Sequence, residues 1–165
     1  MAELTPQERL QPSLLDRLTD KAPDTSTESR DRRVLSMRLL RQAVLRDLAW
    51  LLNTGYLETT ENLEAYPQVR NSVLNYGIPD ISGTSASNAD TAALERSLKD
   101  AIVKFEPRIS PDSLRVSITR DEGKQGRNAM VFTIEGQLWA EPTPMMLYLK
   151  TEVDLETGNI AVTDA

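Results

Sequence analysis

At 165 residues, the chain is long enough for one domain with a hydrophobic core and too short for two. Hydrophobic residues make up 39%, charged residues 27%, and the formal net charge is −6, which are ordinary values for a globular protein. The sequence contains neither cysteine nor histidine, so disulfides, thiolate metal sites, imidazole bases and Ser-His-Asp triads are all excluded.

The start of the chain and its overall charge bear on where the protein works. Residues 1–9 lack the apolar segment of a signal peptide, so we expect a cytoplasmic protein with no direct membrane insertion. The absence of cysteine fits a reducing compartment. Nucleic acid is not an expected partner, because binding to phosphates depends on a net basic surface and this chain is acidic.

Residues 1–28 are predicted to form an N-terminal arm with a short helix. Pro12 suits the first position of this helix, and the leucines at helical spacing are Leu10, Leu14, Leu15 and Leu18. A helix of one or two turns is not stable alone, so it must pack on its own domain or on a neighbour. After a connection rich in polar residues and proline, residues 29–165 are predicted to form a single domain.

Residues 29–53 have the apolar spacing of the longest helix. Gly55 is predicted to take the left-handed conformation that closes such a helix. Arginines crowd its first two thirds: Arg30, Arg32, Arg33, Arg38, Arg41 and Arg46. Two interpretations stay open for them, a solvated helix face or a docking face for an acidic partner.

Residues 67–75 are predicted to form a short helix that begins at Pro67. In residues 72–80, Gly77 and Pro79 indicate a sharp turn. The apolar side chains of this turn are expected to be buried in a packed corner: Val73, Leu74, Tyr76 and Ile78.

Residues 94–105 predict the amphipathic helix around which the rest of the chain is organised. Pro107 lacks a backbone donor and disfavours the helical conformation at Glu106, so the helix should end near Phe105. Glu106 and Arg108 then stand on either side of a rigid corner, where we expect them to face a partner. Glu106, Pro107 and Arg108 are therefore the candidate partner-binding residues. A simple helix stop with two surface charges is the other interpretation.

After Pro111 the apolar period changes from helical to two. Strands are predicted around residues 114–118, 130–138, 147–155 and 160–162, with a turn at residues 121–128. The sequence therefore predicts an α+β fold, in which N-terminal helices and one central amphipathic helix pack on a small antiparallel β-meander. An edge strand of this sheet is either guarded by charge or able to accept a strand from another protein.

An enzyme built from this sequence would rely on carboxylates, hydroxyls, lysines and arginines. Glu106 and Glu135 suggest a glycosidase pair, but no spacing marks them out among 25 acidic residues. Neither a phosphate-binding glycine motif nor a calcium loop is present. We therefore predict no enzyme, with no catalytic residue, no cofactor and no metal. A carboxylate-only peptidoglycan hydrolase and a small regulatory adapter that binds one protein remain as alternatives.

Four motifs occur in order along the chain: Ser13-Leu-Leu-Asp-Arg-Leu18, Asp47-Leu-Ala-Trp-Leu-Leu-Asn-Thr54, Ser72-Val-Leu-Asn-Tyr-Gly-Ile-Pro-Asp80 and Phe105-Glu-Pro-Arg-Ile109. Together with the sheet that follows, they resemble the lysozyme-like baseplate family of contractile phage tails. The pattern is similar to the bacterial branch of that family, the TssE subunits of type VI secretion systems. The resemblance covers nearly the whole chain.

The resemblance implies a structural protein and not a hydrolase. Glu106, Pro107 and Arg108 would contact the helical core bundle that other baseplate wedge subunits form. The sheet would exchange strands with contractile sheath proteins, so that the first sheath ring polymerises on it. A rigid charged corner supports oriented ion pairs, and a strand edge offers main-chain hydrogen bonds to an incoming strand.

Overall fold

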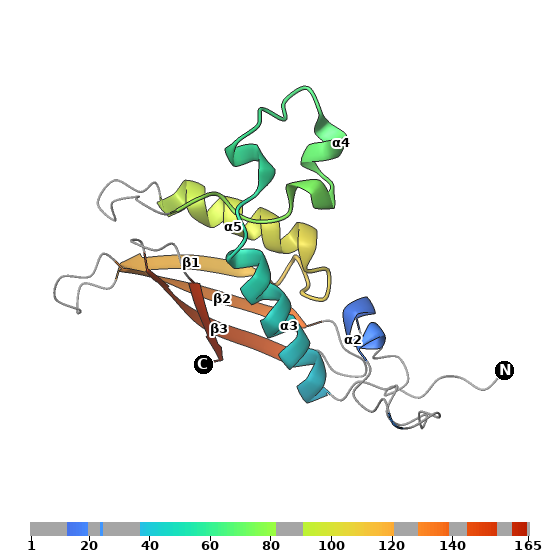
Figure 1. Ribbon diagram of the computed structural model, residues 1–165. Coiled ribbons are helices and arrows are strands. Elements are labelled where there is room, and N and C mark those ends of the chain that lie inside the picture. The colour runs from blue at the N-terminus through green and yellow to red at the C-terminus, as the bar shows by residue number, and fades with distance from the viewer. Residues whose placement is uncertain are drawn as a thin grey trace.

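The computed structural model describes residues 13–19, 24, 37–81, 91–120, 129–138, 145–154 and 160–164. Two helices, α3 (Met37–Leu52) and α5 (Thr91–Phe105), lie on one face of an antiparallel sheet (Figure 1). A short helix, α2 (Leu14–Leu18), lies beside α3. The predicted α+β fold is confirmed. None of the described helices is long and apolar enough to cross a membrane.

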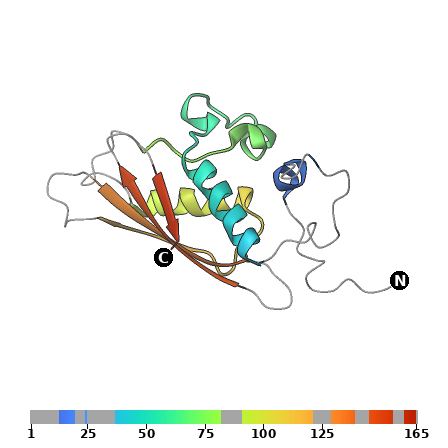
Figure 2. The same ribbon diagram turned by 60° about the horizontal axis from the view of Figure 1, so that its bottom comes forward.

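The described sheet is a meander of four strands in sequence order, β1 (Arg115–Arg120), β2 (Ala129–Leu138), β3 (Met145–Asp154) and β4 (Ile160–Asp164). Its register places Val116, Ile134 and Leu149 opposite one another across β1, β2 and β3. These apolar residues line the face that the helices cover (Figure 2). The strands form where the period of two predicts them, while the predicted turn at residues 121–128 lies outside the described residues.

The core fills the space between the two long helices and the sheet. Its fully buried members include Leu48 from α3, Leu98 and Ile102 from α5, and Phe132 from β2. The apolar stripe of α5 therefore packs as its helical spacing predicts, and the helix ends at Phe105. Because the end of α5 is held by this core, the residues that follow it have a fixed starting point.

Gly55 does not close α3 in the left-handed conformation, contrary to the prediction. Among the described glycines, Gly77 has the positive φ, at 129°. Side chains cap α3 instead, because Asn53 Nδ2 and Thr54 Oγ1 donate to the carbonyls of Ala49 and Trp50, both at 2.7 Å. A Cβ at Gly77 would lie 2.3 Å from the Thr54 carbonyl oxygen, so glycine is required there and not at residue 55.

The predicted helix over residues 67–75 is split into α4 (Pro67–Arg70) and a 3₁₀ turn, Val73–Asn75. Ser72 caps this turn by accepting from the Leu74 N–H at 3.2 Å. The turn directs Asn75 inward and leaves Val73 and Leu74 exposed, so the expected burial of those two side chains is wrong. Tyr76 and Ile78 do pack against the core.

Candidate functional site

The corner after α5 is anchored on both sides. The Glu106 N–H donates to the Ile102 carbonyl at 2.8 Å, and the Glu106 carbonyl accepts from the Ile109 N–H at 3.1 Å. Ile109 is buried over Gly136 of β2. A Cβ added to Gly136 would lie 2.8 Å from the Cγ2 atom of Ile109. Gly136 therefore lets the chain approach the sheet closely, and Pro107 lies at the exposed tip of a rigid turn.

The two charged side chains of the corner bind each other. Arg108 Nε donates to Glu106 Oε1 at 2.6 Å, and Arg108 Nη2 donates to Glu106 Oε2 at 2.5 Å. Glu106 is only 3% exposed, so it lies inward, contrary to the expectation that it faces outward. A carboxylate at such depth needs a charged partner, and the guanidinium two residues later provides it.

Asp47 of α3 continues this ion pair. It accepts from Arg108 Nη2 at 2.6 Å through Oδ2 and from Arg46 Nε at 2.8 Å through Oδ1. The Tyr76 hydroxyl donates to the Asp47 backbone carbonyl at 3.5 Å, and the Tyr76 ring packs edge-on against Phe105, with centroids 5.1 Å apart. Residues from three separate motifs of the sequence therefore meet at the corner.

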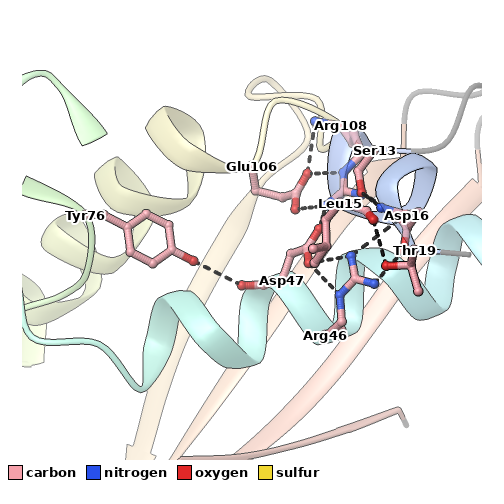
Figure 3. Close-up of polar contacts among 9 residues, drawn as sticks. All are labelled: Ser13, Leu15, Asp16, Thr19, Arg46, Asp47, Tyr76, Glu106 and Arg108. Atoms are coloured by element: carbon pink, nitrogen blue, oxygen red, sulfur yellow. Dashed lines mark hydrogen bonds and ion pairs between the residues drawn. The ribbon is translucent and has the colours of Figure 1, made fainter. Parts of the chain in front are cut away.

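The last member of the series is Asp16 of α2. Arg46 Nη1 donates to Asp16 Oδ1 at 2.6 Å, and the Ser13 hydroxyl donates to Asp16 Oδ2 at 2.6 Å while also capping α2. We call the resulting series the ion-pair chain (Figure 3): Glu106, Arg108, Asp47, Arg46 and Asp16. Its charges alternate in sign, so each inner member has an oppositely charged neighbour on either side.

The opposite charges on either side stabilise the ionised form of three members, Asp16, Arg46 and Arg108. The hydrogen bond from Arg46 lowers the pKa of Asp16 below its ordinary value of 3.8, although burial alone would raise it. Hydrogen bonds to Asp16 and Asp47 raise the pKa of Arg46. Burial opposes the charge of Arg108, but its contacts with Glu106 and Asp47 outweigh burial and raise its pKa. Both arginines therefore remain charged at neutral pH.

A cavity of about 440 Å³ separates α2 from the corner. Ser13 and Leu15 line it on the α2 side. The domain side is formed by Asp47, Trp50, Tyr76, Phe105, Glu106, Pro107 and Arg108. The lining combines apolar side chains with the Arg108 guanidinium and the two carboxylates that bind it, while Arg46 binds Asp16 of α2.

The structure brings Glu106 and Arg108 together, as their closeness in sequence suggests. Three further members of the ion-pair chain were not predicted from the sequence. Asp16, Arg46 and Asp47 hold Glu106 and Arg108 in place, and Asp16 and Asp47 lie in two of the motifs that carry the family resemblance. Arg46 belongs to the arginine-rich helix, where it serves an internal ion pair. Arg30, Arg32 and Arg33 lie outside the described residues.

The structure does not bring Glu106 and Glu135 to one cleft. Glu135 alternates with the buried residues of β2 and therefore lies on the face of that strand turned away from the core, whereas Glu106 is buried beside the helices. Within the described ranges, no group of acidic side chains is arranged to hold a metal ion.

Residues 38–143 match the family described as baseplate wedge protein gp25. The match spans more than half of the chain and includes α3, α5, the corner, β1 and β2, so the chain belongs to this family of structural baseplate proteins. The same family includes TssE. Membership implies interaction with other baseplate components. Neither a curated protein nor a solved structure matches the chain.

Proposed function

We propose that the protein is a cytoplasmic wedge subunit of a type VI secretion baseplate and has no enzymatic role. It docks on the helical core bundle of the wedge through Glu106, Pro107 and Arg108, and it starts the polymerisation of the contractile sheath. The observation that carries the docking proposal is the fixed orientation of Arg108, which two carboxylates from different elements hold at 2.5–2.6 Å. A preoriented guanidinium binds with less loss of side-chain entropy than a free one.

The three residues of the corner have different parts in this docking. Pro107 is exposed and Arg108 is partly exposed, so these two form the contact surface. Glu106 is buried and acts through Arg108, because both of its carboxylate oxygens accept from that side chain. Glu106 is thus a positioning residue. The partner contacts the rigid Pro107 ring and the exposed part of the Arg108 guanidinium.

Co-purification with the other wedge subunits tests the docking. We expect Arg108→Ala to lose the complex while circular dichroism shows a folded protein. Arg108→Lys should bind weakly, because lysine keeps the charge but cannot form the bidentate pair. Arg70→Ala is the matched control, since Arg70 forms an exposed ion pair with Glu58 away from the corner. An Arg108→Ala protein that joins the wedge as well as the wild type would contradict the assignment.

The two described edges of the sheet differ in their ability to accept a strand. On β1, the outward N–H of Ile118 is already bonded to Glu95 of α5, at 2.8 Å. On β4, Asn53 binds both outward backbone groups of Ile160, each at 2.9 Å. Val162 is the next residue of β4 whose backbone groups have the same orientation, because the orientation alternates along the strand. The contact from α5 interrupts β1 inside the strand, whereas the contact from Asn53 lies at the first residue of β4. This difference in position supports β4 as the edge that meets the sheath.

Proline substitutions at the two edges test this choice. Val162→Pro removes an outward N–H and leaves the ladder bonds to β3 in place, so sheath assembly on the baseplate should be lost. Arg120→Pro removes the corresponding outward N–H on β1 and serves as the control. Fluorescent sheath in cells is the readout. Loss of sheath with Arg120→Pro but not with Val162→Pro would assign the other edge.

A further inference from the structure

Helix α2 sits over the surface that the proposed function assigns to a partner. Its Leu15 and its cap Ser13 line the cavity at the corner, and its Asp16 completes the ion-pair chain (Figure 3). We propose that α2 is a replaceable cover of the corner, and that a partner segment with a carboxylate beside an aliphatic side chain takes its place. This inference rests on the proposed docking at the corner.

The cover is weakly held. The helix has five residues, which is too short for stability without packing. Leu14 is 71% exposed and Leu18 is 74% exposed, so two of its three leucines contribute little burial. Among the residues that the structure describes, α2 is attached to the domain through the Asp16–Arg46 ion pair and the half-exposed Leu15. Release of α2 therefore removes few contacts from the domain.

The site is also incompletely filled. Leu15 remains 43% exposed and Trp50 remains 51% exposed, although both face the cavity of about 440 Å³. Pro107 is exposed at its rim. A segment with a bulkier apolar side chain, or with more turns of helix, would bury more of Trp50 and Pro107 than α2 does.

The charges of the site indicate what replaces the cover. Arg46 binds the Asp16 carboxylate of α2, and Arg108 Nη1 is buried with no hydrogen-bond acceptor among the described residues. A partner carboxylate can take the position of Asp16 on Arg46, and Arg108 Nη1 is a further donor in the same ion-pair chain. The replacing segment is therefore acidic and amphipathic, and it carries the same two kinds of side chain as the Leu15-Asp16 pair of α2.

A peptide with the sequence of residues 11–20 tests this chemistry without any wedge subunit. The full chain carries Trp139→Phe so that Trp50 is the remaining tryptophan and its emission reports on the cavity. Leu15→Ala with Asp16→Ala loosens the cover, and we expect the peptide to change Trp50 emission at a concentration at least tenfold lower than in the chain with its own cover intact. Leu14→Ala is the matched control in the same helix and should leave peptide binding unchanged.

A second peptide sharpens the test. Replacing its aspartate by asparagine at the position of Asp16 should abolish binding to the loosened chain, because Arg46 then lacks a carboxylate. If neither peptide changes Trp50 emission in the loosened chain, or if both bind equally, the proposed cover is wrong.

A removable cross-link tests replacement by the natural partner. The sequence has no cysteine, so Thr19→Cys with Gln42→Cys can be bridged by a cleavable bis-maleimide at a single place. Both positions are exposed and lie about one helical turn from Asp16 and Arg46, so the ion pair itself is kept. We expect the bridged chain to bind the wedge subunits at least tenfold more weakly than the same chain after cleavage. Equal binding before and after cleavage would overturn the cover and leave the docking proposal intact. A wild-type chain that joins no wedge, while the loosened chain binds the peptide, would overturn the docking and keep the cover.

Discussion

The ion-pair chain has an inner half and an outer half that differ in burial. The inner half joins Glu106, Arg108 and Asp47, and its deepest member is 3% exposed. The outer half joins Arg46 to Asp16, whose side chains are 32% and 17% exposed. Arg108 and Asp47 lie in the same range at 23% and 24%, so the difference in burial rests on Glu106. Contact distances are nearly the same in the two halves, 2.5–2.6 Å inside and 2.6 Å outside.

Equal distances therefore do not mean equal energetic roles. A buried carboxylate that loses its partner cannot be solvated, so the inner half must stay formed whenever the domain is folded. An accessible pair exchanges its contact for water at little cost, so the outer half can open. This difference suits a series of charges that fixes the corner after α5 at one end and, in the proposed cover, releases α2 at the other.

Glu106→Gln should have the largest effect on stability. The change leaves the partly buried Arg108 guanidinium without its bidentate carboxylate, and we expect a loss of about 2–3 kcal/mol in the free energy of unfolding. Urea unfolding followed by circular dichroism measures it. If Glu106→Gln lowered the free energy of unfolding by no more than the loss of a surface ion pair, the inner half would contribute no more to stability than the outer half.

Asp47→Asn should have the second largest effect on stability. Asp47 is about as exposed as Arg108 and binds both arginines, so we expect a loss of about 1–2 kcal/mol. A double-mutant cycle with Arg108→Ala isolates the coupling between the two residues. Strictly additive effects would mean that Asp47 does not position Arg108.

Low pH should open the outer half first. The pKa of Asp16 is lowered when Arg46, with a smaller contribution from Arg108, faces its carboxylate, so Asp16 takes up a proton more readily when α2 is undocked. The contribution of Asp16 to docking is therefore complete above its ordinary value of 3.8 and is lost as the pH falls through the lower pKa of the docked state. NMR signals of Leu15 between about pH 6 and pH 2 report this change. In Asp16→Asn the position of α2 should not depend on pH in this range.

Glu58→Gln should have the smallest effect and provides the reference. Glu58 pairs with Arg70 at 3.0 Å on the surface, and Arg70 is the more exposed partner. Such pairs contribute about 0–1 kcal/mol, so urea unfolding should change little. If Glu58→Gln lowered the free energy of unfolding as much as Glu106→Gln does, burial would not explain the difference between the two ion pairs.

Local patterns predicted much of the fold. The period of 3.6 in α5, the period of two in the strands, and the stop at Pro107 depend on residues close in sequence, and the structure confirms them. The closure of α3 was mispredicted because glycine often closes a helix, whereas here the side chains of Asn53 and Thr54 cap the last carbonyls. The exposure of Val73 and Leu74 depends on the direction of a 3₁₀ turn, which hydrophobicity does not encode.

The candidate site was predicted in part. Glu106, Pro107 and Arg108 are adjacent in the sequence, so the rigid corner could be recognised without a structure. Asp47 lies 61 positions from Arg108, and nothing in its local pattern indicates that contact. Long-range pairing also decides that Glu106 lies inward, since the same residues without Asp47 and the packed core would present two charges to water.

Asn53 has a consequence for the accuracy of assembly. Its side-chain amide binds the N–H and the carbonyl of Ile160, 107 positions away, much as a residue of a neighbouring strand would. It binds the first residue of β4, so under the proposed function a strand added to this edge would have to align beyond Asn53. A shift of one residue would turn every side chain of an added strand to the opposite face, so in the proposed strand addition Asn53 would limit the number of possible registers.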